Sequence, residues 1–246
     1  MTRRLAKRAF DVVVSLIALI ILAPVLAVVA LAVKLDSRGP VFFRQERIGR
    51  AGRRFMIVKF RTMVSDAQRL GPNVSATQDA RITAVGRVLR RCFIDEAPQL
   101  FNVLRGDMSL VGPRPETPEY VALFTDQERR VLGVRPGMTG PSTLAYSAAE
   151  AAILAEQDDP DRYYRDCLLH ERVAVDLQYL ANVSVGQDIR ILARTSLLVL
   201  SGLGLLPTRP SGEPSPASAL SDGAQPGAFG VGVQPDELPE RSGAHV

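Results

Sequence analysis

Two adjacent carboxylates, Asp95 and Glu96, are the residues of this chain with the clearest chemical potential. Adjacent side chains on a helix point about 100° apart, so one carboxylate can face a reacting centre while the other holds a cation. Acids also favour helix N-termini for purely electrostatic reasons, and the pair alone does not decide between these interpretations. The cations near this pair in the sequence, or in a segment able to reach it, are Lys59, Arg61, Arg87, Arg90, Arg91 and Arg114.

The charge of the chain is distributed unevenly. Residues 1–114 carry 20 Lys and Arg against 8 Asp and Glu, whereas residues 115–246 carry 10 against 18. A basic half of this kind favours an anionic partner, such as phosphate groups, lipid head groups or nucleic acid, although it could also be a solvated basic face.

Other kinds of chemistry find little support in the composition. The two cysteines, Cys92 and Cys167, are far apart and have no metal-ligand spacing, so they predict neither a disulfide framework nor a zinc site. With two histidines in the chain, His170 and His245, catalysis is expected to rest on carboxylates and cations. The basic stretch also lacks an interleaved aromatic platform, so we expect no nucleic-acid partner.

Residues 12–33 form an apolar run in which Ser15 is the one polar residue. A helix of this length is about 33 Å long, enough to cross the hydrocarbon core of a bilayer. A cleaved signal peptide is disfavoured because the run exceeds the usual apolar region of such peptides. A buried soluble helix is disfavoured because the run has no polar stripe.

The flanks of this run favour a re-entrant helix over a spanning one. Basic residues lie on both sides, and positive charge prefers the cytoplasmic face. Pro24 lies near the middle, where it removes a backbone hydrogen bond and bends or breaks the helix. We therefore expect a helix that enters the membrane, turns near Pro24 and leaves by the same face; an ordinary kinked span is the alternative.

The rest of the chain predicts an α+β, mostly helical fold. A hairpin is expected from residues 41–47 and 54–60, joined by a turn-rich link. Several amphipathic or interfacial helices are expected to follow, at residues 81–93, 94–104, 118–132, 146–157, 163–182 and 186–200. This reading divides the chain into a membrane anchor at 1–38, a catalytic domain at 39–206 and a disordered Pro/Gly-rich tail at 207–246.

The residues around the acid pair resemble one enzyme family. The matching segments are Lys59-Phe60-Arg61-Thr62-Met63, Gly86-Arg87, Leu89-Arg90-Arg91, Ile94-Asp95-Glu96, Pro98-Gln99-Leu100, Asn102-Val103-Leu104 and Gly106 through Pro115. They resemble the bacterial sugar transferases that move a phosphosugar from a UDP-sugar to polyprenyl phosphate, the monotopic phosphoglycosyl transferases. The likeness runs from Lys7 to about Arg194, with departures at Ala23, Phe93 and Ala97, and it has the appearance of the minimal form of the enzyme.

The resemblance implies a two-step reaction with a covalent intermediate. Asp95 would attack the β-phosphate of the UDP-sugar and release UMP, and the lipid phosphate would then attack the phosphosugar-aspartate. Glu96 would hold Mg²⁺, a hard ion suited to a carboxylate and phosphate oxygens. The resemblance also points to Lys59, Arg61 and Arg90 as phosphate contacts, to Pro113 and Arg114 for the nucleotide, and to Asp176 as a supporting residue.

The implied setting is the cytoplasmic face of the bacterial inner membrane, at the first membrane step of exopolysaccharide or glycan synthesis. The expected partners are a UDP-sugar, undecaprenyl phosphate, membrane lipids and possible further copies of the chain. A non-catalytic, membrane-anchored binding protein that retains the fold is the alternative function. The identity of the sugar does not follow from the sequence.

Overall fold

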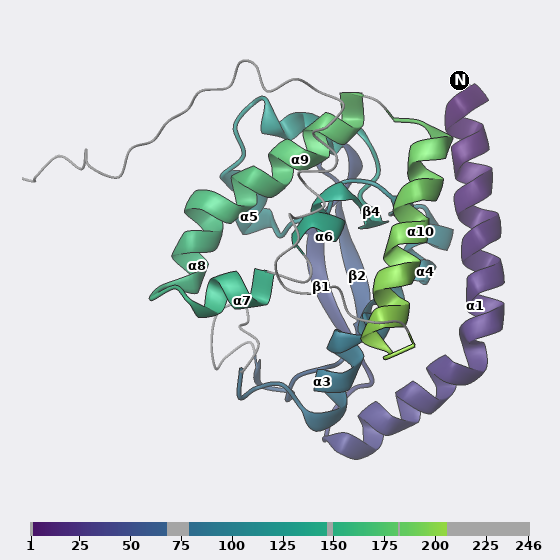
Figure 1. The fold of residues 1–246 in the computed structure, drawn as a ribbon, viewed down its shortest axis with the longest axis vertical. Helices are drawn as coiled ribbons and strands as arrows, with labels where there is room; N and C mark the ends of the chain where they lie inside the picture. The colour runs from purple at the N-terminus through teal and green to yellow at the C-terminus, as the bar shows by residue number, and fades with distance from the viewer. Residues whose placement is uncertain (1, 68–78, 147–149, 182, 206–246) are drawn as a thin grey trace, which may run out of the picture.

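The computed structural model describes residues 2–67, 79–146, 150–181 and 183–205. The tail predicted at 207–246 lies outside the described residues. Within them the fold is α+β and mostly helical, as predicted: helices surround a β-hairpin and a second, very small sheet (Figure 1).

The N-terminal helix α1 runs from Thr2 to Asp36 and is long and apolar enough to cross a membrane. It is one continuous helix through Pro24, and it changes direction along its length (Figure 1). The expected break near Pro24 is therefore a bend, because the neighbouring backbone hydrogen bonds are enough to carry the helix past the proline.

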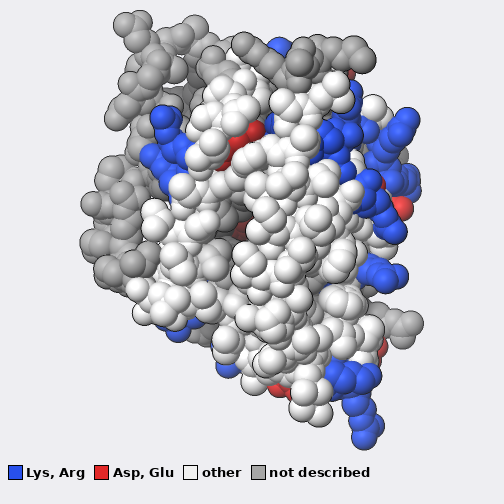
Figure 2. Space-filling model, turned by 90° about the vertical axis from the view of Figure 1, so that its right-hand side faces the viewer, with Lys and Arg blue, Asp and Glu red and all other residues white. Residues whose placement is uncertain are grey.

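Polar contacts fasten the two ends of α1 to the rest of the protein. Near its start, the Arg8 guanidinium donates to the carbonyl oxygens of Val103 and Leu104 at 2.6 and 2.9 Å. Near its end, the Asp36 carboxylate accepts from the backbone N–H of Val85 at 3.2 Å. The apolar middle of α1 stays largely exposed, and Figure 2 shows the broad uncharged face on this side of the molecule, with cations at its margins.

The predicted hairpin is present. Strand β1 (Phe42–Ile48) pairs antiparallel with β2 (Arg54–Phe60), and the short helix η1 (Arg50–Gly52) makes the turn. A second pair was not predicted: β3 (Ser109–Val111) lies parallel to β4 (Gly137–Thr139). Three-residue strands carry too little periodicity to be recognised in a sequence, and here the close approach depends on Gly137, where a Cβ would lie 2.2 Å from the Gly112 nitrogen.

The helix expected at 81–93 is α3 (Ala84–Arg91), which begins at the N-cap Thr83. The segment expected at 94–104 divides into the 3₁₀ turn η2 (Ile94–Glu96) and α4 (Gln99–Arg105). The later helices are α5 (Pro118–Ala122), η3 (Glu128–Gly133), α6 (Pro141–Tyr146), α7 (Glu150–Ala155), α8 (Pro160–Tyr163), η4 (Tyr164–Leu168), α9 (Leu169–Ala181) and α10 (Val185–Gly202).

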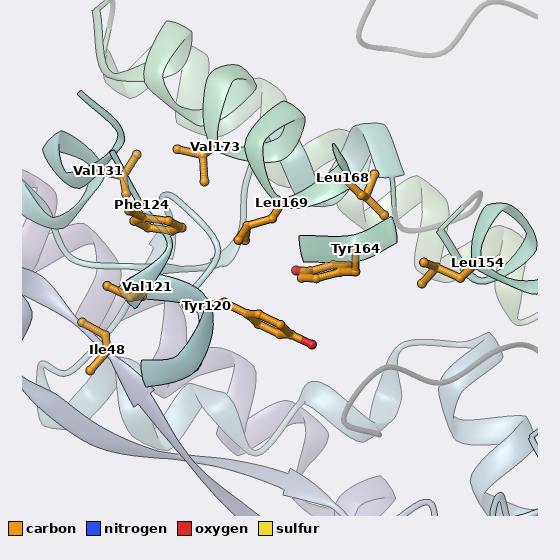
Figure 3. Close-up of a cluster of buried hydrophobic side chains, with 10 residues drawn as sticks. All are labelled: Ile48, Tyr120, Val121, Phe124, Val131, Leu154, Tyr164, Leu168, Leu169 and Val173. Atoms are coloured by element: carbon orange, nitrogen blue, oxygen red, sulfur yellow. The ribbon is translucent and has the colours of Figure 1, made fainter. Parts of the chain in front are cut away.

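Apolar packing joins these elements around the site. Figure 3 shows the cluster in which side chains of α9 and η4 pack on α5, η3 and the end of β1. A second cluster joins α4 and the β3–β4 pair to α1 and α10, and a third joins the end of α1 to β2 and α3. The hairpin, the η2 turn and the loop after β3 are thus held in fixed relation to one another.

Candidate active site

The site lies in a cavity of about 560 Å³ beside the hairpin and the η2 turn. Six of the eight predicted site residues line it: Lys59, Arg61, Arg90, Asp95, Glu96 and Arg114. Pro113 and Asp176 do not line it. The structure therefore brings the acid pair and its cations together from β2, α3, η2 and the loop after β3, which are separate in the sequence.

Asp95 lies in a tight turn immediately after α3. The preceding residue, Phe93, adopts a left-handed conformation with φ 56° and ψ 14°, which is uncommon for a residue with a Cβ. Such conformations concentrate at functional sites, where the surrounding structure holds them. The end of α10 helps to hold this turn in place, because the Cys92 thiol, just before Phe93, donates to the Gly202 carbonyl oxygen at 3.3 Å.

The two adjacent acids have opposite electrostatic settings. Burial and the neighbouring charge of Glu96 raise the pKa of Asp95 to about 6, against the attraction of Lys59 and Arg90. Burial also acts to raise the pKa of Glu96, but Lys59 and Arg114 outweigh it and hold that pKa well below the usual range. Two neighbouring carboxylates are thereby given different properties, one ionised firmly and the other kept at high energy when ionised.

Lys59 makes the closest contact in this group, with its Nζ 2.5 Å from Oε1 of Glu96. Arg90 is positioned by the hydrogen bond that its Nε donates to the Thr62 hydroxyl at 2.8 Å. Gly86 makes this possible, because a Cβ there would lie 2.1 Å from the Thr62 carbonyl oxygen. The absence of a side chain at Gly86 lets α3 approach the end of the hairpin and bring Arg90 to the cavity.

Asp176 supports the loop after β3 from behind. It is buried on α9, and it accepts hydrogen bonds from the backbone N–H of Arg114 at 3.0 Å and from the Ser142 hydroxyl at 2.8 Å. Burial raises the pKa of Asp176 to about 6, although these hydrogen bonds lower it. The Pro113 carbonyl oxygen accepts from the Gly137 N–H at 2.8 Å, so both residues fix the backbone that carries Arg114 into the cavity.

Arg61 lines the cavity wall, but its guanidinium is engaged elsewhere. It donates to the carbonyl oxygens of Ser37 at 2.7 Å, Arg38 at 3.0 Å and Val33 at 3.3 Å. These are the last carbonyls of α1 and the residues just after it, where a cation also interacts favourably with the helix dipole. The structure thus gives Arg61 contacts that cap the end of α1.

Several cavity residues were not recognised from the sequence. Glu116 follows the Pro113–Pro115 segment with no distinguishing pattern, and Tyr164 falls in a stretch that predicts one uninterrupted amphipathic helix. Arg47, Thr117 and Tyr120 complete this part of the wall. Glu116 lies two positions after Arg114 in the sequence, which is a signal that could have indicated it.

The described residues contain no group of three or more His, Cys, Asp and Glu side chains able to hold a metal ion. A magnesium ion needs fewer protein ligands than that when substrate phosphates and water complete its shell. Glu96, firmly ionised and in the cavity wall, fits as the carboxylate ligand of such an ion.

The chain is similar in sequence to several bacterial proteins of known name. A 198-residue stretch is 45% identical to the undecaprenyl-phosphate glucose phosphotransferase of Komagataeibacter xylinus and covers 78% of this chain and 35% of that protein. The UDP-glucose:undecaprenyl-phosphate glucose-1-phosphate transferase of Caulobacter vibrioides is 39% identical, over 78% of this chain and 68% of its own. The exopolysaccharide production protein PSS of Rhizobium leguminosarum is 40% identical, over 77% and 92%.

The chain spans less than half of the length of some relatives, 35% for the Komagataeibacter protein and 44% for an N-acetylgalactosaminephosphotransferase of Aeromonas hydrophila. Residues 2–202 match the family model described as bacterial sugar transferase. This match takes in α1, the hairpin, the acid pair and α10, so the chain belongs to the bacterial sugar transferase family.

Proposed function

We propose that this protein transfers a phosphosugar from a UDP-sugar to polyprenyl phosphate, undecaprenyl phosphate in bacteria, and releases UMP. The observation that carries the proposal is the placement of Asp95, a buried carboxylate with a raised pKa, in a cavity lined by Lys59, Arg90 and Arg114. The names of the relatives, which are phosphotransferases of glucose, N-acetylgalactosamine and galactose acting on undecaprenyl phosphate, support the same reaction class.

The proposed first step forms a covalent phosphosugar-aspartate. A carboxylate oxygen of Asp95 attacks the β-phosphorus, the bond from that phosphorus to the bridging oxygen breaks, and UMP leaves with the bridging oxygen. A phosphate oxygen of the lipid then attacks the same phosphorus, which frees the Asp95 carboxylate and gives the polyprenyl diphosphosugar. Burial favours the attack, because an ionised Asp95 held in a poorly solvated position gains by bonding to phosphorus.

The cations serve the charge that develops on the phosphate oxygens. Arg90 and Arg114 approach the cavity from α3 and from the loop after β3, so a diphosphate between them would meet positive charge from two sides. In this proposal Glu96 holds Mg²⁺, which when bound neutralises phosphate charge. The ion pair with Lys59 keeps the Glu96 carboxylate oriented in the cavity wall.

We place the reaction at the cytoplasmic face of the bacterial inner membrane, where the lipid phosphate and a soluble nucleotide sugar can meet. The bend in α1 and the polar fastening of both its ends to one domain support a re-entrant helix. A helix that crossed the bilayer would have to separate its two ends by the thickness of the membrane. The exposed apolar residues of α10, such as Ile189 and Leu197, lie on a helix beside α1 and extend the surface available to lipid (Figure 1).

The reaction is tested by incubating membranes containing the protein with UDP-sugars, Mg²⁺ and undecaprenyl phosphate, and measuring UMP. We expect UMP from at least one UDP-sugar, and its loss with Asp95→Asn. Asp126→Asn is the matched control, since Asp126 is exposed and outside the cavity wall. Absence of UMP with every common UDP-sugar would refute the proposed reaction, and unchanged UMP release by Asp95→Asn would refute the nucleophile.

The re-entrant helix is tested by cysteine labelling from the cytoplasmic side. Thr2→Cys and Arg38→Cys suit this purpose, in a Cys167→Ser background because Cys167 is exposed. Gly39 is unsuitable, because a Cβ there would lie 2.1 Å from the Arg61 guanidinium. Labelling of both positions from the cytoplasm is expected, and labelling from opposite sides would show a spanning helix.

A further inference from the structure

The cavity wall carries two kinds of side chain. Asp95 with Lys59, Arg90 and Arg114 suits a diphosphate, whereas Glu116, Thr117, Tyr120 and Tyr164 offer hydrogen bonding and aromatic contact. The charges of both Glu96 and Glu116 act to raise the pKa of Arg114, so the two groups adjoin one another at Arg114.

Glu116 is a buried carboxylate, 5% exposed, with acceptor capacity to spare. The Tyr164 hydroxyl donates to Oε1 at 3.0 Å, and Nη1 of Arg47 donates to Oε2 at 3.4 Å. An ionised carboxylate offers about four lone-pair positions, so these two donors leave part of its capacity unused. Hydroxyl groups of a ligand are donors of the right kind.

Thr117, the next residue, supplies an independent sign of a ligand. Its side chain is 4% exposed, and its hydroxyl oxygen has no hydrogen-bond partner among the described residues. It precedes α5 in the N-cap position, yet the hydroxyl makes no capping hydrogen bond. A buried hydroxyl without a partner costs free energy, and such groups call for a specific explanation.

The backbone at Tyr164 is also unusual. Tyr164 begins the π-helical turn η4, inserted between α8 and α9. Single π turns are rare in helices and occur frequently at functional sites, because the extra residue redirects the side chains around it. Here the turn accompanies a tilted contact between the Tyr164 and Tyr120 rings, whose centroids are 4.8 Å apart and whose planes meet at 47° (Figure 3).

We propose that Glu116 and Thr117, with the Tyr120–Tyr164 pair, form a subsite that binds the uncharged, hydroxyl-bearing ring of the donor. This inference rests on the proposed function, because it concerns the same UDP-sugar. Hydroxyl groups of the ring donate to Glu116 and exchange hydrogen bonds with Thr117, while its C–H face packs on the tyrosine rings. Two parts of a UDP-sugar have this chemistry, the transferred sugar and the ribose.

The test is equilibrium binding of UDP-glucose and of UMP to the full chain in detergent, in an Asp95→Asn background that prevents turnover. Glu116→Gln is expected to weaken UDP-glucose binding about 10- to 100-fold, and Thr117→Val about 3- to 10-fold. If the subsite holds the sugar, UMP binding stays unchanged in both variants. If it holds the ribose, UMP binding weakens by the same factor. Either result supports the proposal.

Thermal unfolding without ligand separates binding from structural damage. Since the Thr117 hydroxyl has no partner among the described residues, Thr117→Val should leave the midpoint temperature unchanged or raise it while binding weakens. Glu119→Gln is the matched control, because Glu119 is an exposed acid on α5 that does not line the cavity.

Unchanged binding of both nucleotides in Glu116→Gln and Thr117→Val would overturn the subsite, as would an equal loss in Glu119→Gln. These results can be told apart from a failure of the proposed function. If only the subsite is wrong, the unmodified chain still releases UMP. If the proposed function is wrong, the unmodified chain binds nucleotide without releasing UMP.

Discussion

The Lys59 ammonium forms its ion pair with Glu96, whose Oε1 lies 2.5 Å away, and leaves the adjacent acid Asp95 outside that pair. This pairing separates the properties of two neighbouring carboxylates. Glu96 is held ionised by Lys59 and Arg114, while Asp95 is buried beside a fixed negative charge. An ionised Asp95 is therefore less stabilised by its surroundings than an ionised Glu96.

Asp95→Asn should abolish UMP release and also stabilise the fold. Because the folded protein raises the pKa of Asp95 to about 6, the folded state holds this proton more tightly than the unfolded state does. Its contribution to stability is therefore present below the unfolded pKa and is lost as pH rises through about 6. The asparagine amide does not ionise, so the Asp95→Asn variant keeps this stability at pH 7.5. The midpoint of thermal unfolding should therefore rise, by about 2–4 °C for each kcal/mol gained in the free energy of unfolding. An unchanged or lower midpoint would show that Asp95 is not strained by burial.

The pH profile of UMP release should have an acidic limb set by Asp95. The proposed nucleophile must be ionised to react. The value of kcat/KM, which governs the rate at low UDP-sugar concentration, should therefore rise with pH through about 6. Lys59→Gln removes a charge that lowers the pKa of Asp95, so the limb should move to higher pH. The profile is measured with initial rates between pH 5 and 8, and an acidic limb that stays in place in Lys59→Gln would contradict this assignment.

Arg61→Gln should destabilise the protein without weakening nucleotide binding. The change removes charge-assisted hydrogen bonds to the carbonyls of Val33, Ser37 and Arg38, each of which contributes about 1.5–3 kcal/mol at most. A lower midpoint temperature with an unchanged dissociation constant for UMP is the expected result. Arg53→Gln, at an exposed arginine in the hairpin turn, is the control. The reverse outcome, weaker UMP binding at unchanged stability, would make Arg61 a phosphate ligand as the sequence resemblance implies.

Asp176→Ala should raise KM for the UDP-sugar more than it lowers kcat. The Asp176 carboxylate accepts hydrogen bonds from the backbone N–H of Arg114 and from the Ser142 hydroxyl. Its loss should let the loop after β3, which carries Arg114, shift while Asp95 stays in place. Asp176→Asn retains one acceptor oxygen and should recover part of the affinity. Kinetics over a range of UDP-sugar concentrations separate the two parameters, and a fall in kcat alone would refute a positioning role for Asp176.

Local features of the sequence predicted much of the fold. The hairpin follows from two β-rich segments around a Gly-containing link, α3 from the periodicity of residues 81–93, and the long apolar helix α1 from its length and composition. Each depends on residues near one another in the chain, whose periodicity can be read directly. The continuation of α1 through Pro24 was misjudged, because a proline's effect depends on the rest of the helix.

The acid pair and the cations of the site could also be named from the sequence, through their clustering and the family resemblance. What the sequence left undecided is how distant residues meet. Arg61 and Arg90 have the same charge and lie near the same acids in the chain, yet Arg61 caps α1 while Arg90 bonds to Thr62 at the cavity.

By itself, then, the sequence determined the helices and strands of strong periodicity, the long apolar helix and the acid pair that lines the cavity. Only the tertiary structure decided that Glu116 meets Tyr164, 48 positions later, and that Asp176 supports Arg114, 62 positions earlier. Local periodicity carries no information about such pairs. They depend on the packing of whole elements, and one inserted residue, as in the π turn at Tyr164, is enough to change which side chains face each other.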